Sequence, residues 1–292
     1  MTKSENSFSF LPSNCDAEII DFSHRGGARC QQLLKVRYQG RDLLMKRYGL
    51  KRSFPRMLMR QFGSLALVGK SSISISGRYR TERDALALWQ QEGFDVPRLY
   101  SVPELEANAG PCLVMEWIDG CLLTDLLYKS EIPFEYKAEV LKAFASQWGR
   151  RHDRALQISE PRLLMENPTF DHLFLCDERL IHFDLEIVFT RKTDLERLIR
   201  REIAGILCSL EKSSGPDFPA LLKTLISAYP DPVRFHRTAD ELERYGSIPV
   251  IGSFAWLHRF IRNKGRYANR SLIADHLFQS LQATERHDEV ME

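Results

Sequence analysis

Hydrophobic residues in the first part of the chain follow the pattern of β-strands. Residues 17–22 form one apolar run, and residues 30–38 alternate between apolar and polar positions. A glycine turn separates these two segments, and Gln39-Gly40-Arg41-Asp42 has the composition of a tight turn before the next apolar run. The predicted strands cover residues 17–22, 30–38, 43–48, 94–102 and 111–118.

Helical spacing begins near Thr81 and dominates the chain after Leu122. The first predicted helix ends at Gly93 and carries Glu82 and Asp84 in its first turn, where acids suit the helix dipole. Two strand-like segments, 170–176 and 180–188, interrupt the later helical part. The remaining predicted helices cover residues 134–156, 192–210, 218–229, 238–245 and 271–284.

This order of elements predicts an α+β fold, with a β-rich N-terminal part that contains one main helix and a mostly helical C-terminal part. We expect an N-terminal tail over residues 1–16, a β-rich lobe over 17–119 with a basic insert at about 50–79, and a helical lobe over 120–292.

Composition and charge narrow the function classes only modestly. The chain has 292 residues, of which 43% are hydrophobic and 27% charged, which is typical of a globular protein. Its 41 basic and 39 acidic residues give a formal net charge of +2, so extensive nucleic-acid binding is not expected. The cysteines are scattered without zinc-ligand spacing, which favours free thiols and a cytoplasmic location.

Lys46 lies within an apolar strand, where a charged side chain is costly unless it is paired. Glu82, at the start of the first predicted helix, is the candidate partner; the alternative is an exposed lysine on an edge strand. Gly26 and Gly27 form a turn that either lets backbone amides approach a phosphate or is an ordinary hairpin turn.

A second group of candidate residues lies in the strand-like segments of the helical part. Asp184 follows an apolar strand, a position suited to holding a divalent ion, and Glu186 offers a second carboxylate. The alternative for Asp184 is an acid satisfied by backbone amides. Asn167 and His172 lie upstream, flanked by further acidic groups.

In combination, these residues resemble the bacterial lipopolysaccharide-core kinase group (Kdo kinase, WaaP and InaA) of the protein-kinase-like superfamily. The resemblance covers roughly residues 17–210 and implies a two-lobed protein-kinase-like fold with ATP and Mg²⁺ as cofactors. It is carried by five segments: Leu44-Met45-Lys46-Arg47-Tyr48, Arg80-Thr81-Glu82-Arg83-Asp84-Ala85-Leu86, Gly93-Phe94-Asp95-Val96-Pro97-Arg98-Leu99, Val114-Met115-Glu116-Trp117-Ile118-Asp119-Gly120 and Trp148-Gly149-Arg150-Arg151-His152.

The resemblance assigns roles to individual residues. Lys46 matches the phosphate-binding lysine and Glu82 its helix partner, while Glu116 and Ile118 fall in the hinge strand that meets adenine. Asp184 matches the metal-binding aspartate of the DFG-type motif, although Leu185-Glu186 replaces Phe-Gly.

The catalytic loop departs from the family pattern. Asn167 stands in the place of the catalytic aspartate and His172 in the place of the metal-binding asparagine. An asparagine can orient a hydroxyl but cannot accept its proton. General acid–base catalysis typically contributes about 10²–10⁴-fold to the rate. Glu166 and Asp171 flank the gap and are candidates to supply the missing carboxylate. The sequence leaves open a diverged phosphotransferase, a regulatory pseudokinase and a protein Ser/Thr kinase.

The expected partners are a nucleotide and a sugar or glycolipid acceptor, with a protein acceptor as the alternative; no nucleic acid is expected. From Arg41 to Arg83 there are eleven basic residues against Asp42 and Glu82, interleaved with apolar side chains. Such a segment suits an anionic surface, which predicts peripheral contact with the inner face of the inner membrane; the alternative is a solvated basic face.

We predict that the purified protein co-sediments with anionic liposomes at low salt and less so at high salt, because salt screens the attraction. Neutral phosphatidylcholine liposomes serve as the control. Failure to co-sediment with anionic liposomes at low salt would exclude the membrane contact.

Overall fold

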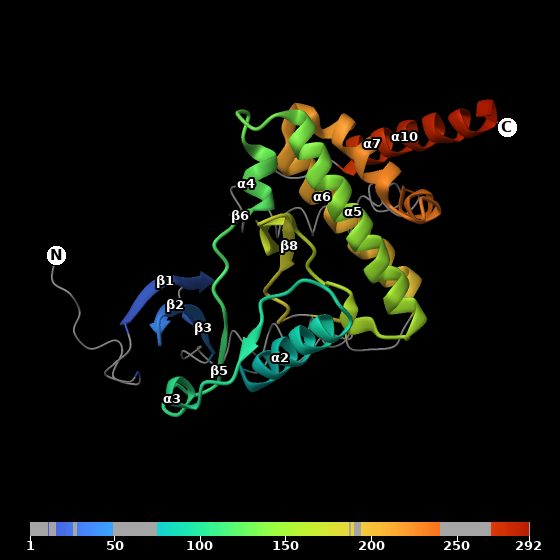
Figure 1. The fold of residues 1–292 in the computed structure, drawn as a ribbon. Helices are drawn as coiled ribbons and strands as arrows, with labels where there is room; N and C mark the ends of the chain where they lie inside the picture. Colours follow the sequence, from blue (N-terminus) through green and yellow to red (C-terminus); the bar gives the residue numbers. More distant parts are fainter. Residues whose placement is uncertain are drawn as a thin grey trace. The chain divides into compact units, whose positions relative to one another are not determined.

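The computed structural model describes residue 11 and residues 16–25, 28–48, 75–186, 188–189, 194–239 and 270–291. Two compact units divide the chain: the first contains residues 1–120 and 176–191, and the second contains residues 121–175 and 192–292. The predicted fold class is confirmed, since an antiparallel sheet dominates the first part and helices dominate the second (Figure 1). The predicted domain boundaries stay a prediction.

The first unit is built on a five-stranded antiparallel sheet with the strand order β1-β2-β3-β5-β4. Consecutive strands β1, β2 and β3 pair as hairpins, and β5 then pairs with β3 on one side and with β4 on the other. Strand β8 (Arg179–His182) also belongs to this unit. The sheet strands are β1 (Asp16–Arg25), β2 (Ala28–Tyr38), β3 (Arg41–Tyr48), β4 (Leu99–Tyr100) and β5 (Cys112–Glu116).

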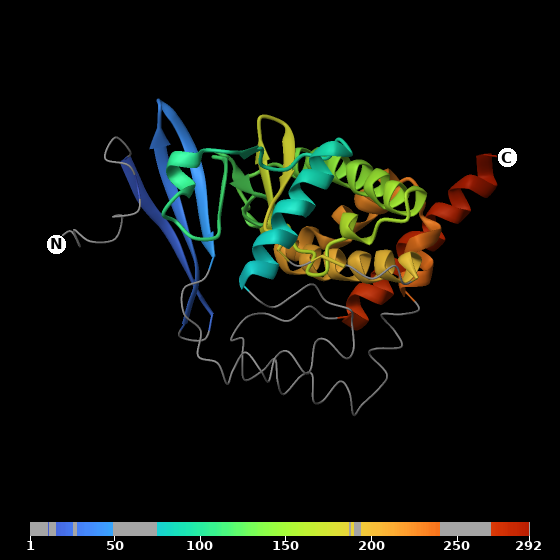
Figure 2. The same cartoon turned by 90° about the horizontal axis from the view of Figure 1, so that it is seen from below.

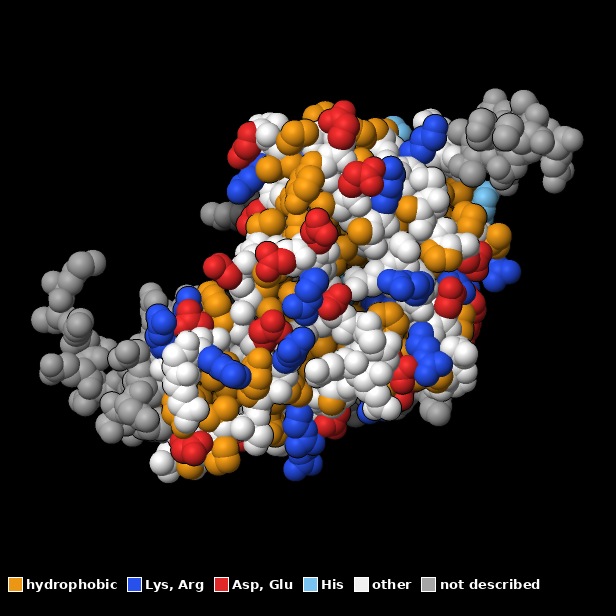
Figure 3. All heavy atoms as spheres, viewed as in Figure 1, with side chains coloured by type: hydrophobic (Ala, Val, Ile, Leu, Met, Phe, Trp, Pro, Cys, Tyr) orange, Lys and Arg blue, Asp and Glu red, His pale blue; other side chains and the backbone are white. Residues whose placement is uncertain are grey.

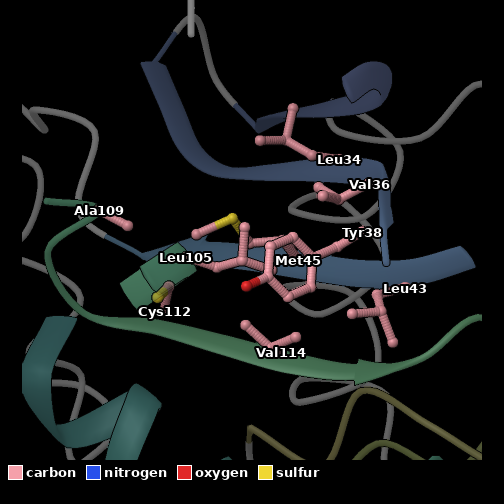
Figure 4. Packing of buried hydrophobic residues seen from close by; sticks show 9 residues of the cluster. All are labelled: Leu34, Val36, Tyr38, Leu43, Met45, Leu105, Ala109, Cys112 and Val114. Carbon is pink, nitrogen blue, oxygen red and sulfur yellow. The ribbon is translucent and has the colours of Figure 1, made fainter. Parts of the chain in front are cut away.

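The two faces of this sheet carry different helices, because side chains along a strand alternate between faces. One face packs against the short helix α3 (Pro103–Glu106), which is visible beside the sheet in Figure 2. Figure 4 shows the apolar cluster formed there by Leu34, Val36, Tyr38, Leu43, Met45, Leu105, Ala109, Cys112 and Val114. The opposite face carries Lys46 and meets helix α2 (Ile75–Gln91).

Helix α2 begins earlier than the sequence pattern predicts. It already includes Ile75, so Glu82 and Asp84 lie in its middle and its first turn contains no acid. The sequence gives no clear helix signal for this turn, because Gly77 and the nearby serines are poor helix formers. Tertiary contacts support it instead, including an edge-to-face contact between Tyr79 and Tyr48.

Three of the predicted strands were too long. Only Leu99–Tyr100 of the predicted segment 94–102 forms a strand, because Pro97 lacks the N–H that a ladder needs. The predicted segment 170–176 opens with a 3₁₀ turn at Phe170–His172, and strand β7 begins at Leu173. The predicted segment 180–188 is a strand only as far as His182.

The second unit is mainly helical. Strand β6 (Cys121–Leu122) pairs antiparallel with β7 (Leu173–Cys176), and residues 233–239 are also helical. Helix α5 packs against α7 and α6, and its buried face includes Trp148, Arg151 and His152. The longer helices are α4 (Leu123–Tyr128), α5 (Phe134–Gln157), α6 (Leu195–Ser214), α7 (Phe218–Ala228) and α10 (Arg270–Met291).

The surface agrees with the near-neutral composition. Acidic and basic side chains are interspersed with apolar ones over the face shown in Figure 3. Among the helices that the structure describes, none has the length and apolar character needed to cross a bilayer.

Candidate functional site

A buried lysine organises the candidate site of the first unit. Lys46 is only 5% exposed and lies on β3, the third of the five sheet strands. Its ammonium group lies 2.9 Å and 2.8 Å from the two carboxylate oxygens of Glu82 on helix α2. It also lies 2.6 Å from Asp184 Oδ1 and 3.9 Å from Glu186 Oε2. One ammonium group therefore contacts carboxylates from two distant parts of the sequence, Glu82 on α2 and Asp184 and Glu186 after β8.

The surrounding charges keep Lys46 protonated. Burial by itself lowers the pKa of Lys46, but Asp184 and Glu82 raise it by more, so the pKa lies above its ordinary value. Lys46 therefore carries its charge at neutral pH.

Tyr48 is a site residue that the sequence analysis missed. It lies two residues after Lys46, on the same face of β3, and its hydroxyl donates to Glu82 Oε2. Burial, followed by the charge of Glu82, raises the pKa of Tyr48, so the hydroxyl keeps the proton that it donates. The sequence signal that could have identified Tyr48 is its i,i+2 spacing from Lys46, because side chains two residues apart on a strand point to the same face, here toward α2.

Local contacts within the first unit hold the segment that carries Asp184. Arg179 on β8 donates to Asp95 at 3.2 Å, and the backbone N–H of His182 donates to the Asp95 carbonyl at 3.0 Å. The His182 ring packs edge-on against Trp89 of α2. Asp184 then adopts φ = 61°, a left-handed conformation that a non-glycine residue rarely adopts. Such strained conformations concentrate at functional sites.

The three carboxylates around Lys46 fit a divalent cation by their chemistry. Oxygen atoms of Glu82, Asp184 and Glu186 all lie within 4.8 Å of one another. Carboxylate oxygens are the ligands that Mg²⁺ prefers in proteins. Asp184 is the more accessible of the two acids of the DFG-like segment, with a side chain that is 30% exposed against 10% for Glu186.

The predicted hinge residues lie at the end of β5. Glu116 donates its backbone N–H to the Arg98 carbonyl at 2.8 Å, and its side chain accepts from the Arg98 N–H at 3.2 Å. The Glu116 N–H is therefore already used within the first unit. Ile118 follows β5 in a segment without regular secondary structure and is half-buried. The predicted glycine turn, Gly26 and Gly27, lies outside the described residues.

The remaining predicted residues belong to the second unit, in the loop before β7. Asn167 and Asp171 are exposed, whereas Glu166 and His172 are half-buried. Asp171 lies in the 3₁₀ turn, where its carboxylate accepts from the Thr169 hydroxyl at 3.2 Å. His172 donates its backbone N–H to the Thr169 carbonyl at 3.1 Å.

One face of helix α6 anchors this loop at three points, since residues 202, 205 and 209 share a face by their i, i+3, i+7 spacing. The Glu202 carboxylate accepts from the Met165 N–H at 2.8 Å, and the Ser209 hydroxyl accepts from the Phe170 N–H at 3.0 Å. Between them, Gly205 lets Pro168 approach the helix so closely that a Cβ would overlap the proline ring. The loop is thus fixed on both sides of the exposed Asn167.

Glu202 is also the centre of a buried charge network. It accepts hydrogen bonds from Arg151 and, at 3.1 Å, from the Trp148 indole N–H, while Arg151 donates to the Leu163 carbonyl at 2.7 Å. Burial by itself raises the pKa of Glu202, but Arg151, His152 and the Met165 N–H lower it by more, to about 2. Burial lowers the pKa of His152, so its ring is neutral near pH 7.

Comparison with known proteins gives only distant structural similarity. No protein-family model matches the chain. No curated protein sequence matches it. Among solved structures, a "putative fructosamine-3-kinase" from Haemophilus somnus 129PT has a TM-score of 0.40 and 12% identity, with 91% of each chain covered. A pseudokinase in its apo form has a TM-score of 0.40 and 16% identity, with 73% of this chain and 86% of that chain covered.

We predict that Gly205→Ala destabilises the protein by about 1–3 kcal/mol, because the added Cβ overlaps Pro168 in a packed contact. Without such an overlap, glycine-to-alanine exchange inside a helix stabilises a protein by about 0.5–1 kcal/mol. The sign of the change in the free energy of unfolding therefore tests the close contact. Urea unfolding of Gly205→Ala, Pro168→Ala and the double variant checks it. We expect the double variant to recover part of the loss, and a more stable Gly205→Ala protein would refute the close contact.

We predict that Glu202→Gln lowers the free energy of unfolding by about 3–5 kcal/mol at neutral pH, because it leaves the buried Arg151 without a counter-charge. The folded-state pKa of Glu202 is depressed, so its contribution is present above the unfolded value near 4.5 and is lost as the pH falls toward 2. The neutral His152 adds an earlier loss below about pH 6.5, since only the unfolded chain then binds its proton.

Urea unfolding of the wild type and Glu202→Gln near pH 7 and at about pH 3.5 measures this dependence, and the difference between them should shrink at the lower pH. Glu139→Gln on the exposed side of α5, whose pair with Lys142 is solvated, should change stability by about 0.5 kcal/mol or less. A pH-independent difference would contradict the depressed pKa.

Proposed function

We propose that this protein binds ATP with Mg²⁺ in the first unit and transfers the terminal phosphoryl group to an alcohol acceptor. The observation that carries the proposal is the contact of buried Lys46, on the third strand, with Glu82 of the following helix and with Asp184. Protein kinases use this arrangement to hold the nucleotide phosphates and the metal ion.

We assign each residue a role, and for Lys46, Glu82 and Asp184 the contacts of the structure support it. Lys46 keeps its charge and would bind the α- and β-phosphates, while Glu82, itself held by Tyr48, orients the ammonium group. Asp184 and Glu186 would hold the metal ion, which neutralises phosphate charge when bound. Ile118 and Glu116 would meet the adenine base, and the glycine turn at Gly26 and Gly27 would cover the phosphates.

Asn167 would orient the acceptor hydroxyl by hydrogen bonding, with Glu166 or Asp171 as the candidate carboxylate and His172 as a further metal ligand. Phosphoryl transfer depends mainly on positioning and charge neutralisation, so the missing aspartate slows the reaction without abolishing it. The firm anchoring of the Asn167 loop on α6 supports an orienting role. For the acceptor we propose a lipopolysaccharide-core sugar hydroxyl, on the sequence resemblance alone; a protein hydroxyl is the alternative.

A nucleotide-binding pseudokinase is the second candidate function. The exposed, neutral Asn167 favours it, because no carboxylate occupies the position that matches the family's catalytic base. Such a protein would bind nucleotide or a partner and act as a regulatory or scaffold protein without transferring phosphate.

We predict that ATP with Mg²⁺ raises the melting temperature of the wild type, because a ligand that binds only the folded state stabilises it by mass action. Lys46→Ala and Asp184→Ala should lose this ligand-induced shift. Arg37→Ala and Asp177→Ala, which remove a basic and an acidic side chain at exposed positions of the first unit, should retain it. Differential scanning fluorimetry measures the shift against each variant's own ligand-free melting temperature.

A wild type that shows no shift would exclude the proposed nucleotide site. Slow ADP formation with water as acceptor, absent in Asp184→Ala, separates the phosphotransferase from the pseudokinase. A shift without any ADP formation over hours supports the pseudokinase.

A further inference from the structure

Arg78 is a second cation at the edge of the site, and the roles described above do not use it. It lies on α2 one turn before Glu82, its side chain is only 17% exposed, and its guanidinium donates to Glu186 Oε1. Glu186 thus contacts Arg78 through one oxygen, while its other oxygen lies 3.9 Å from Lys46. The carboxylate assigned to the metal ion is therefore already neutralised by the protein.

Acidic and basic side chains alternate in this cluster. Among the described residues, three carboxylates, on Glu82, Asp184 and Glu186, contact the cations Lys46 and Arg78. Three acids in such close proximity would repel one another, and these two side chains hold them together. A divalent cation that binds Asp184 and Glu186 must therefore compete with Lys46 for Asp184 and with Arg78 for Glu186.

Helix α2 links the competition at Asp184 with the competition at Glu186. Arg78 and Glu82 are four residues apart and share one face of the helix. That face therefore holds Lys46 through Glu82 and the DFG-like segment through Arg78. When a metal ion takes the carboxylates, Lys46 and Arg78 need new anionic partners, and the triphosphate of a nucleotide offers them. Metal and nucleotide therefore each favour the binding of the other.

We propose that Arg78 is an internal counter-ion that competes with the divalent cation for Glu186 and makes the binding of metal and nucleotide cooperative. This inference rests on the proposed function, because it takes Asp184 and Glu186 as the metal ligands. Competition by Arg78 would make metal binding weak in the absence of nucleotide.

The test measures binding of Mn²⁺ alone, from the loss of the electron paramagnetic resonance signal of the free ion. Arg78→Gln should bind Mn²⁺ about tenfold more tightly than the wild type, within the usual range of site–site coupling. Arg80→Gln is the matched control: it removes the same charge from the same helix at an exposed position, and its affinity should stay within about twofold of the wild type. With a non-hydrolysable ATP analogue present, the advantage of Arg78→Gln should shrink.

The outcomes separate this inference from the function on which it rests. If Asp184→Asn binds Mn²⁺ as the wild type does, the proposed metal site fails. If Asp184→Asn abolishes binding while Arg78→Gln matches Arg80→Gln, the metal site stands and the competition by Arg78 is refuted.

Arg78→Lys keeps the charge but not the forked contact, and its affinity should lie between those of the wild type and Arg78→Gln. Circular dichroism melts establish that each variant is folded. If Arg78→Gln does not fold, Arg78→Lys decides: an affinity equal to that of the wild type in this weakened contact overturns the proposal.

Discussion

The burial of one ammonium group governs the first unit. Lys46 is surrounded by the sheet and α2, and a lone charge there would be strongly destabilising. Glu82 and Asp184 reduce that cost, so the fold must bring β3, α2 and the segment after β8 together at one point. The contacts of Arg179 and His182 with Asp95 keep the last of these segments in place. Charge compensation at Lys46 thus determines the architecture and the candidate chemistry together.

The pairing of Lys46 with Glu82 could be predicted because each residue carries a local signal, whereas the contact of Asp184 with Lys46 was not predicted. Alternation around Lys46 predicts a strand, and the cost of a buried charge requires an acid nearby. Glu82 satisfies that requirement 36 residues away. The apolar run that ends at Asp184 likewise marks a strand followed by an acid. Each inference used one short pattern and one energetic rule.

What the sequence could not predict depends on contacts across long separations. The extra N-terminal turn of α2 is hidden by Gly77, and without that turn Arg78 has no helical register with Glu82. Its partner Glu186 is 108 residues away. Glu202 and Ser209 look like ordinary helix residues until the loop around Asn167 is seen to bind them. No local pattern indicates which loop will meet a given helix face.

The two groups of candidate residues are held in physically different ways, and this difference bears on function. Lys46, Asp184 and Glu186 form a charged cluster whose contacts would compete with the proposed phosphate and metal ligands. Asn167 instead lies in a loop fixed by backbone hydrogen bonds and a proline–glycine contact, which no ligand needs to break. A neutral amide contributes only by its orientation, so its effect depends on such fixation. The fixed position of Asn167 is what we expect of a group that orients an acceptor hydroxyl, and it supports the proposed phosphotransferase.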